Sequence, residues 1–327
     1  MPQARRFLMK ENRFLYFLKG IGCIAVVFIH VPFPGTPGSV IKQLCAFAVP
    51  VFLMSSGYFA VGIREDQALR RLKKTAQMLL YGLAASLLVT LVREIRRGSA
   101  EAWLAAHLSW RTLGKALIFC TVDFAVPLWY LIAMCEVWAL WLLVIRKGKQ
   151  RAALSLIPVL NAARIFLSVY CKTRRVDWFW EINFLTTALP WFLIGYWIRE
   201  NEDRVRGWGD GSLWAAMAGG ALLSLIPVLF HTRIRFSVLG DVPYAVSLFI
   251  LAVKHPDRRI SGWAEGIGKH LSAGVYLLHG PADAVVLWMA SRAVGTEGIY
   301  ARIHPLLVAL CALAAAGMIR IIFPRKR

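Results

Sequence analysis

Two ionisable side chains stand in the first apolar stretch of this 327-residue sequence, which runs from Phe14 to Phe33. They are Lys19 and His30, and ten residues separate them. At roughly 100° per residue, eleven steps place both side chains within about 20° of one helix face, about 16 Å apart along the axis. A cation at one depth and a group that exchanges protons near neutral pH at another suit the two ends of one long substrate.

Both residues also have a structural explanation. Lys19 is close enough to the start of the stretch for its ammonium group to reach the membrane interface. His30 is close to the far end, where its ring has the option of a hydrogen bond to a neighbouring helix. The first stretch by itself leaves the functional and the structural interpretation open.

The composition indicates a membrane protein that crosses the bilayer several times. Hydrophobic residues make up 58% of the chain, and apolar runs of spanning length recur from end to end. The net charge of +21 lies mostly in short loops between these runs, so it does not predict nucleic-acid binding. None of the six cysteines forms a CxxC pair, so neither a metal site nor a disulfide framework is predicted.

The predicted fold is an all-α integral membrane bundle of about ten transmembrane helices in a single domain, residues 1–327. A short N-terminal segment, 1–13, precedes the bundle at 14–323, and a basic tail, 324–327, follows it. The ten spans are Phe14–Phe33, Gln43–Ile63, Ala76–Val92, Pro127–Ile145, Ala152–Tyr170, Ile182–Ile198, Leu213–Phe230, Val238–Val253, Leu271–Ser291 and Ile303–Phe323. The polar stretch 93–115, which interleaves tryptophan and leucine with charges, is predicted to lie in the membrane interface.

The distribution of lysine and arginine predicts the orientation. These residues are more numerous in the two termini and in the loops after the even-numbered spans than in the other loops. Basic loops face the cytoplasm, so both termini are expected there, in a multi-pass protein of the cytoplasmic membrane. Lys19 then lies toward the cytoplasm and His30 toward the outside.

Four segments, in order along the chain, resemble the membrane acyltransferase-3 family. The first span carries the family's basic residue, ten residues and histidine, within LKGIGCIAVVFIH. Phe47–Phe59 resembles its second-helix signature, which ends in Ser-Gly followed by an aromatic residue. Pro127–Leu131 (PLWYL) and Ser272–Pro281 (SAGVYLLHGP) are similar to its Trp-aromatic-Leu and Tyr-Leu-x-His segments. The resemblance covers nearly the whole chain.

The resemblance implies transfer of an acyl group, commonly acetyl, from cytoplasmic acyl-CoA to a hydroxyl of a cell-surface or lipid-linked glycan. Acyl-CoA is then a co-substrate, and no tightly bound cofactor is expected. Lys19 is implied to hold the phosphates of acyl-CoA, and His30 to act as general base or transient acyl carrier. Family members often have an acid and an arginine near the start of this helix, whereas here the acid is missing and lysine replaces arginine. Lysine keeps the charge without the bidentate fork.

Further residues are predicted to line the cavity or contact the substrate: Ser55, Ser56, Tyr58, Trp129, Tyr130, Glu136 and His279. Each has a structural alternative, because serines bond back to their own helix and aromatic residues form interfacial belts. Glu136 is expected either to orient His30 or to pair with Arg164. His279 shares a helix face with Asp283, and Pro281 between them is expected to weaken the helix.

A transporter or flippase-like carrier of a small or lipid-linked substrate is the alternative function, since proline-interrupted spans and buried charges fit it as well. An acyltransferase predicts a cation-lined tunnel that opens to the cytoplasm and ends at His30, whereas a carrier predicts a midplane site with two gates. Some relatives carry an extracytoplasmic hydrolase-like domain, which is not expected here. Transfer is then either direct or completed by a separate extracytoplasmic protein.

Overall fold

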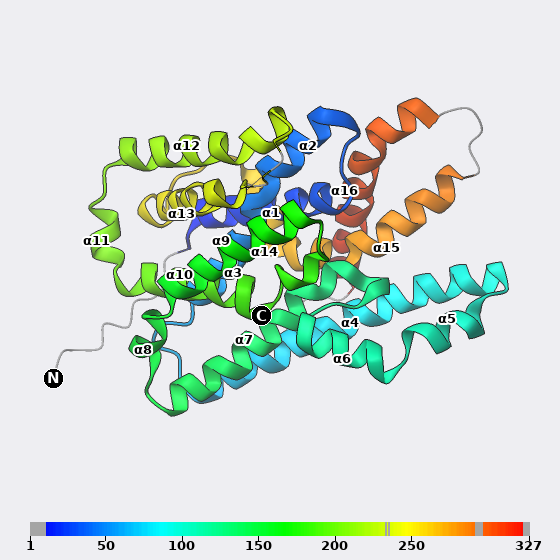
Figure 1. Ribbon diagram of the computed structural model, residues 1–327, viewed down its shortest axis with the longest axis horizontal. Coiled ribbons are helices and arrows are strands. Elements are labelled where there is room, and N and C mark those ends of the chain that lie inside the picture. The colour runs from blue at the N-terminus through cyan, green and yellow to red at the C-terminus, as the bar shows by residue number, and fades with distance from the viewer. Residues whose placement is uncertain (1–10, 233, 235, 292–296, 323–327) are drawn as a thin grey trace.

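The computed structural model describes residues 11–232, 234, 236–291 and 297–322, which form helices and loops without a β-strand (Figure 1). The helices of the first half are α1 (Arg13–His30), α2 (Gly35–Leu44), η1 (Cys45–Phe47), α3 (Ala48–Tyr58), α4 (Glu65–Arg97), α5 (Ala100–His107), α6 (Trp110–Phe119), η2 (Asp123–Leu128) and α7 (Trp129–Arg146). Those of the second half are α8 (Gln150–Leu154), α9 (Ile157–Arg174), η3 (Trp178–Trp180), η4 (Phe184–Ala188), α10 (Leu189–Glu200), α11 (Glu202–Arg206), α12 (Asp210–Leu229), α13 (Val238–Lys254), α14 (Gly262–His270), α15 (Ser272–Ala290) and α16 (Glu297–Ile322). The predicted all-helical class is confirmed.

Eight helical stretches of the described chain are long and apolar enough to cross a membrane. They are Arg13–His30, Gly35–Tyr58, Glu65–Arg97, Trp110–Arg146, Gln150–Arg174, Asp210–Leu229, Ser272–Ala290 and Gly298–Ile322. They correspond to eight of the ten predicted spans. The sixth and eighth predicted spans overlap α10, with 12 residues, and α13, with 17. The count of ten and the cytoplasmic placement of both termini stay predictions.

The sixth predicted span begins with irregular helix, which the hydrophobic pattern does not reveal. The Asn183 side chain accepts hydrogen bonds from the backbone N–H groups of Leu185 and Thr186, each at 3.0 Å. Such local bonds compete with regular helix formation. The chain turns through the π-type helix η4 before α10 begins at Leu189.

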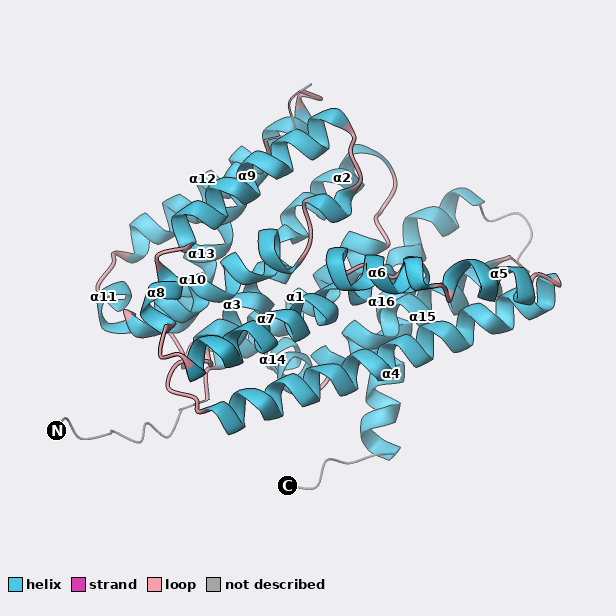
Figure 2. Ribbon diagram, turned by 60° about the horizontal axis from the view of Figure 1, so that its bottom comes forward, coloured by secondary structure: helices cyan, strands magenta, loops and turns pink. Residues whose placement is uncertain are grey.

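Helix α4 is longer than the sequence pattern predicts. It extends over 33 residues and runs along one side of the bundle (Figure 2). The third predicted span is only its middle part, and the first residues of the stretch predicted for the interface are its last turn. The rest of that stretch forms the short helices α5 and α6.

Helix α1 joins two hydrophobic cores. The larger core takes buried side chains from α1, α3, α7, α10 and α13, and includes Leu18 of α1. The smaller core takes them from α1, α14, α15 and α16, and includes Cys23 and Val27 of α1. Helix α1 packs against α3, α14 and α15. These contacts hold α1, and with it Lys19 and His30, in place within the bundle.

Glycines allow α1 and α14 to approach closely. A Cβ atom at Gly20 would lie 1.9 Å from the carbonyl oxygen of Ala264, and one at Gly268 would lie 1.8 Å from that of Tyr16. These neighbours are backbone atoms, so a side chain at either position has to push the two helices apart. Small residues have this role at many helix interfaces in membranes.

We expect Gly268→Ala to destabilise the protein by about 1–3 kcal/mol, the usual cost of overpacking a well-packed interface. The measurement is thermal unfolding in lipid nanodiscs, and the matched control is Gly219→Ala, since a Cβ at Gly219 meets nothing within 4 Å. Equal stability of the two variants would contradict the close packing of α1 on α14.

Candidate active site

His30, the last residue of α1, lies against a second histidine, His279 of α15. The centroids of the two rings are 5.3 Å apart, with an angle of 35° between the ring planes. Within the described part of the chain, no hydrogen bond or ion pair engages the His30 side chain. The two histidines come from predicted segments almost 250 positions apart along the chain, and the fold brings them together.

His279 is buried and is held in one tautomer. Its Nδ1 atom lies 2.7 Å from the carbonyl oxygen of Tyr276, and its side chain is only 1% exposed. Because a carbonyl oxygen only accepts hydrogen bonds, Nδ1 carries the proton of the neutral ring. The Nε2 atom of His279 is then an acceptor, and it is buried without a hydrogen-bond partner.

A chain of aromatic side chains continues from this histidine pair. Tyr276 lies 5.9 Å from His279 and 5.5 Å from Tyr130, measured between ring centroids. Tyr130 in turn lies edge-on to Trp129, at 6.4 Å. The Tyr276 hydroxyl donates a hydrogen bond to the carbonyl oxygen of Pro127 and so ties α15 to η2. Of the segments that resemble the family, the fourth supplies His279, which lies next to His30. The third supplies Tyr130, which lies next to Tyr276 of the fourth, and Ser56 of the second interacts with Tyr130.

Lys19 lies on the other half of α1, near a second cation, Arg71. Its Nζ atom is 5.3 Å from the centroid of the Phe59 ring. Arg71 of α4 is close enough to repel the Lys19 charge, and it stacks over the Trp138 ring at 5.3 Å. Among the described residues, neither cation has a carboxylate partner. Two neighbouring cations without a counter-ion favour the binding of an anion.

A family model described as an acyltransferase domain matches residues 12–320, nearly the whole chain. The chain belongs to the membrane acyltransferase-3 family. Neither the search of curated proteins nor that of solved structures found a match. The protein is therefore an acyltransferase, and its apolar helices make it a multi-pass membrane protein.

Two serines of the acyltransferase that were predicted near the site bond back to their own helix. The Ser55 hydroxyl donates to the carbonyl oxygen of Val51 at 2.7 Å, and that of Ser56 donates to Phe52 at 3.1 Å. Ser55 is buried, whereas Ser56 is partly exposed. Serines in membrane helices commonly form such bonds. Ser56 also interacts with Tyr130 of the aromatic chain.

Tyr58 lies toward the Lys19 half of α1, next to Phe59, and not beside His30. Its hydroxyl donates to Glu202 at 2.7 Å and accepts from Arg199 at 3.0 Å. Burial raises the pKa of Glu202, but hydrogen bonds from Tyr58 and Arg206 and the Arg199 charge outweigh it and hold that pKa below its ordinary value. Glu202 therefore stays charged at neutral pH, and Tyr58 joins α3 to α11.

Glu136 contacts neither of its two predicted partners. Its Oε2 atom accepts a hydrogen bond from the Cys120 thiol at 3.2 Å. Arg164 instead lies 3.6 Å from Asp241 and over the Trp191 ring, at 4.8 Å from the centroid. The ion pair of Arg164 with Asp241 therefore joins α9 to α13.

Asp283 and His304 form a pair that sequence reasoning did not find. His304 of α16 has its Nε2 atom 2.9 Å from Oδ1 of Asp283, although the angles are not those of a hydrogen bond. Helix α15 continues through Pro281, so Asp283 and His279 do lie on one unbroken helix. The partner of Asp283 comes from another helix, and no spacing in the sequence indicates it.

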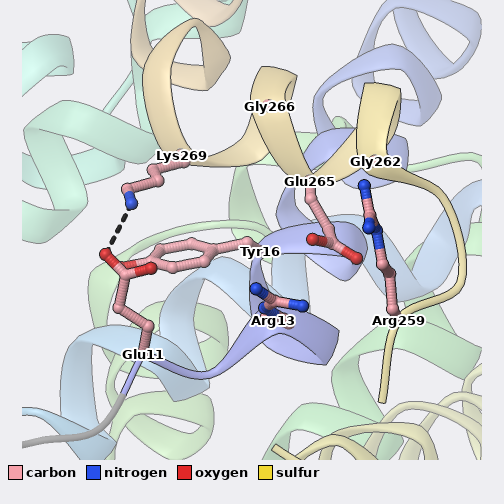
Figure 3. A pocket seen from close by; sticks show the side chains of 8 residues that line it. All are labelled: Glu11, Arg13, Tyr16, Arg259, Gly262, Glu265, Gly266 and Lys269. Carbon is pink, nitrogen blue, oxygen red and sulfur yellow. Dashed lines mark hydrogen bonds and ion pairs between the residues drawn. The ribbon is translucent and has the colours of Figure 1, made fainter. Parts of the chain in front are cut away.

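A polar cavity of about 260 Å³ lies beside the first turns of α1, between α1 and α14 (Figure 3). Its charged lining consists of Glu11, Arg13, Arg259, Glu265 and Lys269. The hydrogen bond from Lys269, together with its charge, holds the pKa of Glu11 below its ordinary value. Lys19 is not in the lining, so this cavity is separate from the axis between Lys19 and His30.

Proposed function

We propose that this acyltransferase transfers an acyl group, most simply acetyl, from cytoplasmic acyl-CoA to a hydroxyl of a cell-surface or lipid-linked glycan. One observation carries the proposal: α1 bears an uncompensated cation and a histidine free of hydrogen bonds about 16 Å apart on one axis. Acyl-CoA has matching parts, namely anionic phosphates and a thioester joined by a long, thin arm.

The donor end of the site is assigned to Lys19 and Arg71. Their charges have no carboxylate partner, so the phosphates of acyl-CoA supply the missing counter-charge. The arm then follows α1 toward His30, and the acyl group comes to rest near Tyr130, Tyr276 and His279. Trp129 supports this wall from behind through Tyr130.

The transfer step is assigned to His30. Its ring takes the proton of the acceptor hydroxyl as the oxygen attacks the thioester carbonyl carbon. The carbon–sulfur bond breaks, the new carbon–oxygen bond forms the ester, and the departing CoA thiolate takes the proton back from His30. In a two-step version the His30 ring itself carries the acyl group before the hydroxyl attacks.

The first test uses the purified protein in nanodiscs, with acetyl-CoA labelled in the acetyl group and a panel of glycans as acceptors. Release of free CoA together with label in a glycan is the expected result. Absence of both binding and turnover with acetyl-CoA and with succinyl-CoA would overturn the proposal. Transport of the same glycans across sealed vesicles would then test the carrier alternative.

A further inference from the structure

A second cavity, of about 240 Å³, lies between α4, η2 and α15 and is called the His279 cavity here. Its lining includes Ser86, Thr90, Asp123, Phe124 and His279. His30 is not in this lining, but its ring lies next to that of His279. His279 therefore belongs both to the cavity and to the histidine pair, and it links the two.

Three polar residues in the lining of the His279 cavity, Ser86, Thr90 and Asp123, have side chains without a partner among the described residues. Ser86 and Thr90 lie one turn apart on α4, and neither hydroxyl has a hydrogen bond within the described residues. The Ser55 hydroxyl, by contrast, bonds back to its own helix. The Asp123 carboxylate also has no partner in the described chain. Hydroxyls and a carboxylate that converge on one cavity provide hydrogen bonds for a ligand.

The central part of α4, residues 78–92, is apolar apart from Ser86 and Thr90, which makes this polar strip distinctive. Leu88, between the two hydroxyl residues, is 64% exposed, as expected for a side chain in contact with lipid. The polar strip instead faces α15 and η2, against which α4 packs. The strip is thus turned inward, toward the helix that carries His279.

The charges of the cavity favour an uncharged ligand. The one cation in the lining, Arg93, is already paired with Glu94 at 2.8 Å. Asp283, also in the lining, is paired with His304, which leaves the Asp123 carboxylate unpaired. An anionic ligand would be repelled by that carboxylate, whereas hydroxyl groups donate to it and accept from Ser86 and Thr90.

The volume of the His279 cavity and its aromatic wall further restrict the kind of ligand that fits. A volume of about 240 Å³ is below the ~300–1,000 Å³ usual for drug-sized ligands, so it suits one ring and not a long chain. The Phe124 ring, held edge-on by Trp103 at 5.5 Å, offers an apolar face for the C–H groups of such a ring. Hydroxyl recognition on one side and an aromatic ring on the other are what a sugar requires.

We propose that the His279 cavity binds the acceptor as a single uncharged pyranose ring, with the reacting hydroxyl directed past His279 toward His30. The proposal rests on the proposed function, because it identifies the acceptor side of the same site. The chemistry is the transfer step described above, in which the hydroxyl proton passes to His30 and the thioester bond breaks.

The test measures sugar binding without any acyl-CoA, by saturation-transfer NMR on the protein in nanodiscs. The probes are methyl glucopyranoside, methyl mannopyranoside and, as the anionic comparison, methyl glucuronide. Nanodiscs replace detergent because alkyl-glycoside detergents are themselves sugars. The variant is Thr90→Trp, which fills the cavity, and the matched control is Leu88→Trp on the outward face of the same helix.

We expect wild type and Leu88→Trp to bind an uncharged glycoside and to bind the glucuronide more weakly, and Thr90→Trp to lose the signal. Thr90→Val, which removes only the hydroxyl, is expected to weaken binding about fivefold, the usual effect of one hydrogen bond. It also serves if Thr90→Trp fails to fold. Equal binding by all variants, or no binding of any uncharged glycoside by wild type, overturns the acceptor site. Failure of acyl-CoA turnover is a separate result and concerns the proposed function.

Discussion

Replacing His30 with alanine is expected to lower the rate constant of acyl transfer by about 100- to 10,000-fold, the usual contribution of a general base. The affinity for acyl-CoA is expected to change little, because the two cations proposed to hold its phosphates, Lys19 and Arg71, lie on the other half of α1 and on α4. The measurement is release of CoA at saturating donor and acceptor, with donor affinity determined separately by equilibrium binding.

The matched control is His270→Ala. His270 ends α14, is exposed and has no part in the histidine pair, so its loss tests the general effect of removing an imidazole. A His30→Ala protein that kept the wild-type rate would contradict both versions of the transfer step.

The two versions are separated by rapid quenching with labelled acetyl-CoA when no acceptor is present. Label that stays on the wild-type protein and is missing from His30→Ala supports an acyl-histidine. Wild-type protein without label, but with acceptor-dependent CoA release, supports His30 as a general base.

The sequence predicted the candidate site best where both residues lie on one helix, because helix geometry then fixes their relative placement. Lys19 and His30 share a helix face by spacing alone. The predicted span Phe14–Phe33 corresponds to α1, Arg13–His30, which ends three residues earlier than predicted. The prediction that Trp129, Tyr130 and His279 lie at one site depended on the family resemblance. Helical periodicity could not supply it, because periodicity does not say which helices are neighbours. Tyr58 shows the limit of that resemblance, since its motif is intact while its hydroxyl joins Arg199 and Glu202.

Partners that come from distant helices could not be predicted. Nothing in the spacing of Arg71 indicates that its charge approaches Lys19, and nothing near Asp283 indicates His304. The same holds for Arg164, which was predicted as one of two partners of Glu136 and instead pairs with Asp241. Tertiary packing determines which of these side chains become neighbours. The pattern of a single sequence does not show which helices pack together.

Replacing Lys19 with alanine is expected to weaken acetyl-CoA binding by about 10- to 100-fold, since a hydrogen bond to a charged group contributes ~1.5–3 kcal/mol. The rate at saturating donor is expected to stay close to that of wild type, because the proposal places the thioester at His30, about 16 Å from Lys19 along α1. Lys19→Arg is expected to keep the affinity, as it retains the charge and adds the fork that suits phosphate. Lys19→Met controls for bulk, because its unbranched side chain is nearly as long as that of lysine and carries no charge.

The donor itself provides the sharpest control for the phosphate role of Lys19. S-Acetyl-pantetheine carries the same thioester on the same arm but lacks the nucleotide phosphates. If Lys19 and Arg71 hold those phosphates, Lys19→Ala and Arg71→Ala should each weaken use of acetyl-CoA and leave use of S-acetyl-pantetheine unchanged. The effect should also shrink as salt is added, because ions screen charge–charge attraction. An equal loss with both donors would show that Lys19 supports the helix bundle and not the phosphates, and the donor would then have to enter along another path.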